Sequence, residues 1–220
     1  MNQISISKHL ARKVPGIKLS CIACDVEFKQ KNEELWNEIS EKIATIAAGL
    51  KVEQISRIPA IAFSRRAYKA CGKDPARYRL SAEALLRRVV KRKELYQVNN
   101  VVDLLNLVSI TSGFSIGGYD SDKIKGNITF GIGEKVEPFE GIGRGELNIE
   151  FLPVFRDGEG AFGSPTSDSL RTSVSEETKR FLMVIIYFGG GELLQATELA
   201  IMLLKKYAGA GNIEIKTVTE

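Results

Sequence analysis

The chain has 220 residues, of which 44% are hydrophobic and 26% charged, and its formal net charge is +4. This balance is typical of a folded globule and excludes a disordered tail. No run of about 18 apolar residues occurs, so no membrane-spanning helix is predicted. The start of the chain lacks the basic-then-apolar order of a secretory signal, which predicts a cytoplasmic protein.

Residues 1–56 are predicted to form a strand and a helix that pack on the same globule as residues 57–220, the main domain. Alternating apolar residues over 17–26 indicate the strand. Residues 33–50 carry leucine and isoleucine at helical spacing, which indicates the helix. We expect Trp36, on this helix, to lie in the core.

The three cysteines, Cys21, Cys24 and Cys71, are an odd number and indicate free thiols in a reducing compartment. Cys21 and Cys24 lie on the predicted strand, where a spacing of three residues sends side chains to opposite faces. A zinc site needs four ligands, and His9, the one histidine, is expected at the surface. The sequence therefore predicts no metal and no cofactor.

Positive charge is concentrated in residues 57–93. This block contains twelve lysines and arginines but only two acidic residues, a net charge of +10, so the rest of the chain carries −6. A basic block within a mildly acidic protein is typical of a surface that binds a polyanion such as RNA. The alternative is a solvated helix face, and no aromatic pattern of the kind that stacks on single-stranded RNA accompanies the block.

A helix is predicted inside this block, with Ser81 as its N-cap and an apolar stripe along one side. At 100° per residue, Arg87, Arg88 and Lys91 fall opposite the stripe and are expected to face solvent. A basic pair precedes this helix in the sequence. The candidate RNA-binding residues are therefore Arg65, Arg66, Arg87, Arg88 and Lys91.

Periodicity and glycine turns predict the other elements. The expected helices are residues 64–71, 101–111 and 192–207. The expected strands are residues 124–132, 136–139, 146–151, 181–188 and 213–218. Because helices and strands alternate along the chain, the predicted fold class is α+β, a layered globule with a mixed central β-sheet flanked by helices.

Two glycine-rich segments are candidates for chemistry. Gly189–Gly191 lies between a strand and a helix, where backbone amides can cradle phosphate, but it lacks the P-loop Lys-Ser/Thr, and Glu192 would repel an anion. We therefore interpret it as a tight turn. In the polar segment 156–172, Asp168 and Arg171 either pair with each other or line a small pocket.

Four ordered motifs carry a resemblance to a known family. They are Asp74-Pro-Ala-Arg-Tyr-Arg-Leu-Ser-Ala-Glu-Ala-Leu-Leu-Arg-Arg88, Asn99-Asn-Val-Val-Asp-Leu-Leu-Asn-Leu-Val108, Ser115-Ile-Gly-Gly-Tyr-Asp120 and Asp168-Ser-Leu-Arg-Thr172. Together they resemble the B3/B4 domain of phenylalanyl-tRNA synthetase beta subunits and of stand-alone proteins of the same family. The resemblance spans roughly residues 57 to 207.

The resemblance implies a module that hydrolyses wrongly attached tyrosine from tRNA, with a Thr-Asn pair, a histidine and a glutamate at its site. Here the Asn is Asn106, but its Thr neighbour is Leu105, the histidine falls on Gly117, and the glutamate falls near Val184. The pocket is thus expected to persist without those polar groups, and no catalytic residue is assigned. The implied substrate-binding residues are Asn106, Gly117, Asp120, Asp168 and Arg171.

Three functions remain open at this point. The first is a module that binds tRNA or aminoacyl-tRNA and deacylates mischarged molecules in trans. The second is a non-catalytic RNA-binding module, and the third is a protein that binds an amino acid-like small molecule on the same fold. The predicted partner is tRNA or aminoacyl-tRNA, RNA, or a small molecule, respectively, and no membrane partner is predicted.

Overall fold

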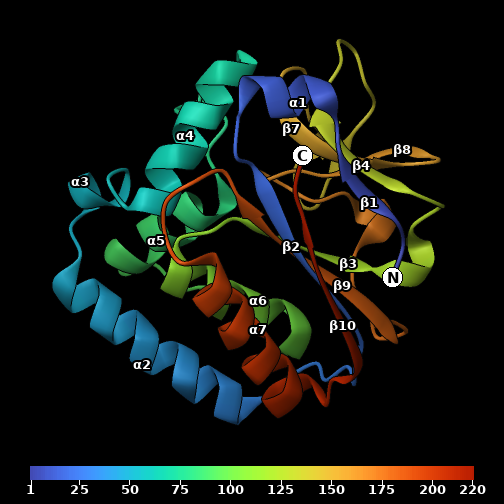
Figure 1. The fold of residues 1–220 in the computed structure, drawn as a ribbon. Helices are drawn as coiled ribbons and strands as arrows, with labels where there is room; N and C mark the ends of the chain where they lie inside the picture. Colours follow the sequence, from blue (N-terminus) through green and yellow to red (C-terminus); the bar gives the residue numbers. More distant parts are fainter.

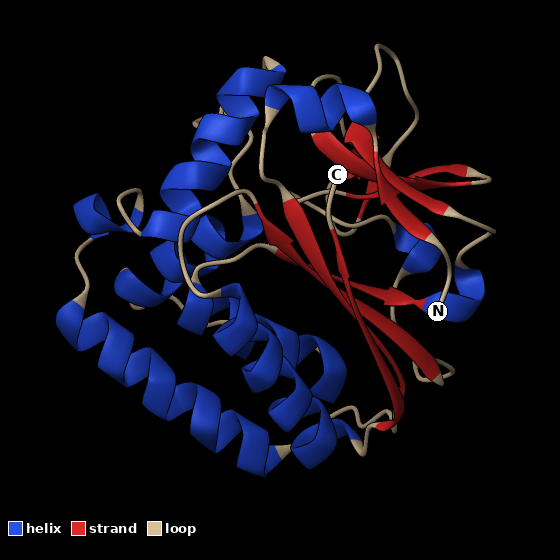
Figure 2. Ribbon diagram, in the orientation of Figure 1, coloured by secondary structure: helices blue, strands red, loops and turns tan.

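The computed structural model describes residues 1–220 and has three layers: a group of helices, a middle sheet and an outer sheet (Figures 1 and 2). The helices are α1 (Lys8–Lys13), α2 (Glu33–Gly49), α3 (Val52–Ile55), α4 (Pro59–Cys71), α5 (Ser81–Val90), α6 (Asn100–Ser112) and α7 (Leu193–Ala208), with 3-10 turns η1 (Ser121–Lys123) and η2 (Leu170–Thr172).

Two four-stranded sheets contain most of the β structure. The middle sheet has the order β10 (Gly211–Val218), β2 (Lys18–Asp25), β9 (Arg180–Tyr187), β3 (Ile116–Asp120), all antiparallel. The outer sheet has the order β1 (Ile4–Ile6), β4 (Ile128–Ile132), β7 (Pro153–Asp157), β8 (Gly160–Gly163), and its β1–β4 pair is parallel. A small ribbon pairs β5 (Glu140–Gly141) with β6 (Gly145–Glu146).

The central strands β2 and β9 of the middle sheet are buried on both faces, which explains the unbroken apolar run in β9. Alternate residues of each central strand belong to different cores. Cys24 and Met183 pack in the core that contains the helices, whereas Cys21 and Val184 pack in the core between the two sheets. The prediction that the two cysteines point to opposite faces is therefore confirmed.

The core between the sheets is aromatic. Phe130 of β4 stacks on Phe155 of β7 with ring centroids 4.1 Å apart, and Tyr119 meets Phe162 edge-on at 4.9 Å. These rings occupy the space between the sheets close to the edge strands β3 and β8. This edge also holds several of the candidate site residues.

The first 56 residues contribute strands to both sheets. β1 pairs with β4, and β2 lies between β9 and β10 with an eight-residue register against β9. Figure 1 shows the N-terminal segment crossing the molecule from the outer sheet to the helices. The strands of this segment are thus hydrogen-bonded to strands from the rest of the chain.

The α+β class and most of the regular elements are confirmed, including the strands at 17–26, 181–188 and 213–218 and the long helices. The expected strands at 136–139 and 146–151 are wrong, because a loop with a two-residue ribbon occupies that region. Val136 and Phe151 there adopt positive φ angles of 58° and 66°, which a β-strand does not allow. The expected strand 124–132 shortens to β4.

Several elements were not predicted from the pattern. They are β1, α1, α3, β3, β7 and β8. Ser81 is not the N-cap as predicted but the first residue of α5, and the preceding Leu80 provides no side-chain cap. The Ser81 amide donates to the carbonyl of Pro165. No helix is both long and apolar enough to span a lipid bilayer.

Gly189–Gly191 form a bend in the connection between β9 and α7. All three residues have positive φ angles, and a Cβ on Gly189 would lie 2.2 Å from the ring of Phe63. The turn needs glycine because the backbone passes directly against this ring. A phosphate cradle is therefore not required to explain the glycines.

Candidate nucleic-acid interface

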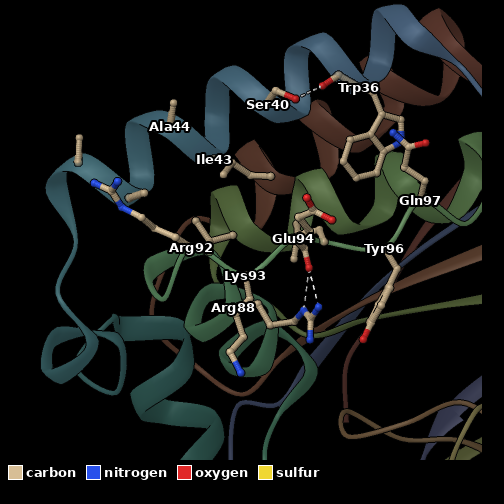
Figure 3. A pocket seen from close by; sticks show the side chains of 14 residues that line it. Trp36, Ser40, Ile43, Ala44, Arg88, Arg92, Lys93, Glu94, Tyr96 and Gln97 are labelled. Atoms are coloured by element: carbon tan, nitrogen blue, oxygen red, sulfur yellow. Dashed lines mark hydrogen bonds between the residues drawn. The ribbon is translucent and has the colours of Figure 1, made fainter.

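The largest of the five main clefts of the surface is a groove of about 1300 Å³ between α2 and the segment that runs from the end of α5 through residues 91–97 (Figure 3). Three cationic and two aromatic side chains line it, with one acidic residue. They are Arg88, Arg92, Lys93, Trp36, Tyr96 and Glu94. We call this cleft the basic groove.

One side of the basic groove is formed by small and apolar side chains of α2. Ile43 and three alanines of that helix line it. A second cleft of about 430 Å³ shares Trp36, Ser40 and Gln97 with the groove and adds Lys31. The hollow surface therefore continues along α2 toward the N-terminus of that helix.

Arg88 and Tyr96 form a stacked pair in the groove. The guanidinium of Arg88 lies 4.4 Å from the centroid of the Tyr96 ring, and it donates two hydrogen bonds, of 2.6 and 3.1 Å, to the carbonyl of Glu94. Tyr96 is 72% exposed. Since the arginine fixes the loop beneath it, the tyrosine ring is held at the surface with one face open to a ligand.

Trp36 and the loop are held by the same buried carboxylate. Trp36 is half-buried, which corrects the expectation that it lies in the core, and its Nε1 donates to Asp103 Oδ2 at 2.7 Å. Asp103 Oδ1 accepts from the amide of Val98 at 3.0 Å. Burial is the main cause that raises the pKa of Asp103. Asp103 thus holds Trp36 and, at Val98, the end of the loop that carries Tyr96.

The turn after α5 brings two further cations to the groove. Arg92 adopts a left-handed conformation, with φ of 53°, which ends the helix, and Leu95 anchors the loop in the core with 8% exposure. Arg92 and Lys93 remain exposed and form no ion pair. Their charge is therefore available to an anionic ligand.

Two of the predicted RNA-binding arginines meet at a buried carboxylate instead of facing solvent freely. Arg65 Nη1 donates to Glu83 Oε2 at 2.8 Å, and Arg87 Nε donates to Glu83 Oε1 at 3.0 Å. Arg79 Nε lies 4.0 Å from the same Oε1. Glu83 is only 1% exposed. Arg87 consequently points toward α4, while its neighbour Arg88 points into the basic groove.

The other predicted cations are dispersed. Arg66 is exposed and stacks on Phe63 at 3.8 Å from the ring centroid, and Lys91 is exposed at the end of α5. Lys73, in the same block of charge, is buried and donates to the carbonyl of Asn148 at 3.0 Å. The basic block is therefore several small groups of cations rather than one face.

The predicted substrate-binding residues do not come together at one site. Asp168 and Gly117 come together at the edge between the two sheets, where Tyr119 Oη donates to Asp168 Oδ1 at 2.9 Å and a Cβ on Gly117 would lie 2.0 Å from that hydroxyl. Gly163 of β8 approaches the same hydroxyl, and a Cβ on Gly163 would lie 2.2 Å from it. The space beside Gly117 is thus filled by the Tyr119 side chain.

Asp168 joins the free edges of both sheets. Its backbone forms a bridge with Gly163 of β8, while its carboxylate accepts hydrogen bonds from Tyr119 and from the amides of Gly118 and Ser164. Burial, which outweighs these hydrogen bonds, raises the pKa of Asp168 to about 7. Because unpaired edge strands expose donors and acceptors, this contact closes the open side of the two-sheet core.

The remaining three residues have other partners. Asp120 caps η1, accepting from the Asp122 amide at 3.1 Å, and also accepts from Thr178 Oγ1 at 2.8 Å. Arg171 pairs with Asp157 at 2.8 Å, so the alternative in which Asp168 and Arg171 pair with each other is wrong. Asn106 is half-buried on α6, among the helices.

The positions matched to the editing site of the synthetases also lie apart from one another in the structure. Gly117 and Val184 are direct partners in the middle sheet, on the face toward the outer sheet. Leu105 of α6 approaches Gly118 on the opposite face, where a Cβ on Gly118 would lie 2.6 Å from Leu105 Cδ1. Asn106, next to Leu105, and Gly117 therefore belong to different faces of the sheet.

Substitution of Gly117 by alanine is expected to destabilise the protein by about 1–3 kcal/mol, because the new methyl group must displace the buried Tyr119 ring or the strand. Urea unfolding of the two proteins measures the difference. Gly211→Ala is the matched control, since its Cβ meets nothing within 4 Å. Equal loss in both variants would contradict the tight packing of Tyr119 over Gly117.

Sequence reasoning did not identify Trp36 and Tyr96 as groove residues. Trp36 sits 60 residues away from Tyr96 in the chain, and only the packing of α2 against the 91–97 loop brings them to one cleft. The one available signal was Tyr96 itself, an aromatic residue in a polar stretch immediately after the basic helix.

A layered α+β protein with a groove of cations and aromatic rings fits the class of nucleic-acid-binding modules. A model of the B3/4 domain family matches residues 64–209, and the chain belongs to the B3/B4 domain family. The resemblance inferred from the sequence motifs is therefore confirmed. Family membership supports a nucleic-acid-binding module at the level of the family.

The solved structures similar to this chain include that of an N-terminal fragment of the phenylalanyl-tRNA synthetase beta-subunit from Pyrococcus horikoshii. The two share 17% identity with a TM-score of 0.48, over 98% of this chain and 50% of that one. The chain thus spans about half the length of the solved fragment. No curated protein sequence matches the chain.

Proposed function

We propose that this protein is an RNA-binding module whose partner is tRNA or aminoacyl-tRNA, and that it binds through the basic groove. The observation that carries the proposal is the juxtaposition of Arg88, Arg92 and Lys93 with the rings of Trp36 and Tyr96 in one open cleft. Membership of the B3/B4 family supports the same class of ligand.

The two kinds of side chain have different tasks in this proposal. The cations neutralise backbone phosphates and release counterions, while aromatic rings stack on bases irrespective of sequence. Because Tyr96 is 72% exposed and backed by Arg88, it offers one face to a base without rearrangement. The groove is suited to unpaired nucleotides, whose bases are free to stack.

Binding of labelled tRNA, followed by fluorescence anisotropy over a series of salt concentrations, tests the proposal. With three phosphates neutralised, the logarithm of the binding constant should fall with the logarithm of salt at a slope of about −2. A single-stranded RNA of the same length should bind better than a fully paired duplex. Absence of binding, or binding indifferent to salt, would reject the proposal.

Deacylation of mischarged aminoacyl-tRNA in trans is a separate part of the hypothesis. The positions matched to the editing site include Leu105, Gly117 and Val184, none of which transfers protons, so binding and hydrolysis need separate tests. Incubation with tRNAs carrying different amino acids, with release of the amino acid as the readout, measures hydrolysis. Since tRNA is the proposed partner, we place the protein in the cytoplasm.

A small-molecule pocket is not part of the proposal. None of the five main clefts is lined by Asn106, Asp120 or Asp168. Asp120 and Asp168 are engaged in hydrogen bonds within the protein. We therefore keep the groove, and not these residues, as the binding surface.

A further inference from the structure

Three arginines surround one buried carboxylate at the junction of α4 and α5. Glu83 accepts hydrogen bonds from Arg65 at 2.8 Å and from Arg87 at 3.0 Å, and Arg79 lies at 4.0 Å. The Glu83 side chain is 1% exposed, while those of Arg65, Arg79 and Arg87 are 25%, 47% and 28% exposed. The carboxylate is thus inside and the guanidinium groups reach the surface.

The charges of this cluster do not balance. One carboxylate opposes three guanidinium groups, which leaves two positive charges concentrated at one place on the surface. Arg65 and Arg87 use one nitrogen each on Glu83, and Arg65 gives one further long hydrogen bond of 3.4 Å to the carbonyl of Pro75. Each guanidinium has five N–H donors, so most donors of the cluster have no protein acceptor.

The chemistry of the unused donors identifies the ligand. Guanidinium groups bind phosphate oxygens through paired, charge-assisted hydrogen bonds, and several arginines around one point are typical of phosphate recognition. A buried carboxylate that fixes their orientation lowers the entropy that would be lost on binding. The cluster is therefore organised before the ligand arrives.

We propose that Arg65, Arg79 and Arg87 form a site for one phosphate group, with Glu83 as the positioning residue that orients them. The inference rests on the proposed function in one respect: the natural ligand is a backbone phosphate of the RNA that occupies the basic groove. Arg87 and Arg88 are consecutive on α5, one directed to the cluster and the other to the groove. An RNA strand that crosses α5 places a phosphate on the cluster and a base on Tyr96.

The first test compares an arginine that belongs to the cluster with a nearby arginine that does not. Arg79→Ala and Arg77→Ala each remove one exposed arginine from the same loop, but only Arg79 lies near Glu83, while Arg77 forms no ion pair. We expect RNA affinity to fall about fivefold or more for Arg79→Ala, which corresponds to at least about 1 kcal/mol, and by less than twofold for Arg77→Ala. Equal losses would overturn the site.

In the second test, the proposed site and the change in net charge predict opposite effects on RNA affinity. Glu83→Gln removes a negative charge from a basic region, so non-specific electrostatics alone predicts tighter RNA binding. Orientation by Glu83 predicts weaker binding, by about threefold or more, because the three guanidinium groups lose their anchor. Tighter binding in Glu83→Gln would overturn the positioning role. If this variant fails to fold, the comparison of the Arg79 and Arg77 variants decides the question.

Inorganic phosphate provides a test that does not need RNA. A ligand that binds the folded state raises the melting temperature by mass action. Because phosphate also stabilises folded proteins in general, the informative quantity is the difference between variants. We expect phosphate to raise the melting temperature, relative to chloride at equal ionic strength, by more in the wild type and in Arg77→Ala than in Arg79→Ala. No effect of phosphate in the wild type would reject the site.

The two proposals fail in distinguishable ways. If phosphate stabilises the wild type more than Arg79→Ala but the protein binds no RNA, the phosphate site stands and the proposed function falls. If RNA binds and groove variants lose it, while phosphate has no effect and the Arg79 and Arg77 variants behave alike, the proposed function stands and the phosphate site is rejected.

Discussion

Substitution of Arg88 by glutamate is expected to lower the affinity for RNA at least tenfold at physiological salt. The change removes a cation from the basic groove, introduces an anion there and deletes the two hydrogen bonds that hold the Glu94 carbonyl.

Tyr96→Ala should cost about 1–3 kcal/mol of binding free energy, the usual contribution of one base stacked on one aromatic ring. Because Tyr96 is 72% exposed, its truncation should leave the fold intact.

Fluorescence anisotropy with the same RNA as for the wild type measures both changes. Lys216→Glu is the matched control for charge reversal, since Lys216 is exposed on β10 and does not line the groove. Tyr96→Phe keeps the ring and should bind nearly as well as the wild type. The groove would be excluded as the RNA site if Arg88→Glu and Lys216→Glu gave the same small loss.

The free energy of unfolding is expected to decrease as the pH rises from about 4 to 7, because of Asp168. Its pKa is raised from 3.8 to about 7 in the folded protein, chiefly by burial. Between these values the folded state binds a proton that the unfolded state has released, so protonation favours the folded state at low pH and this stabilisation disappears as the pH approaches 7. At about 1.4 kcal/mol per pH unit, the contribution is about 2–4 kcal/mol.

Urea unfolding at several pH values between 4.5 and 8 measures this dependence. Other groups titrate in the same range, so the informative quantity is the difference between the wild type and Asp168→Asn, which cannot lose a proton. We expect the variant to gain stability relative to the wild type as the pH rises, and the difference to level off above pH 7. A difference that stays constant over the range would show that Asp168 has an ordinary pKa in the folded protein.

Much of the fold could be predicted because its signals are local. The alternation in β2, the apolar run of β9 and the 3.6-residue spacing of α2 and α6 each follow from which faces are buried. The failures occurred where local preference was overruled. Val136 and Phe151 have side chains typical of strands, but their positive φ angles place them in loops. The short strand β8 lies in a glycine-rich segment without a clear period, and β7 directly precedes that segment.

The candidate site was less predictable than the fold. The charge block contains both Arg88, which lines the groove, and Arg87, which pairs with a buried glutamate, and the sequence could not distinguish the two. Helical geometry places the two side chains about 100° apart, and only the position of α4 decides that one meets Glu83 while the other reaches a groove. The apparent pocket around Gly117 depends in the same way on Tyr119, whose ring fills it.

The sequence by itself determined the α+β class, the family, the two-faced burial of the cysteine strand and the concentration of positive charge within residues 57–93. These properties are encoded in composition, periodicity and motifs within short segments of the chain. The tertiary structure alone decided which cations are free, that Trp36 and Tyr96 share a cleft with Arg88, and that Asp168 closes the edge between the sheets. Such contacts join residues far apart in sequence, and their geometry depends on how whole helices and sheets pack against each other.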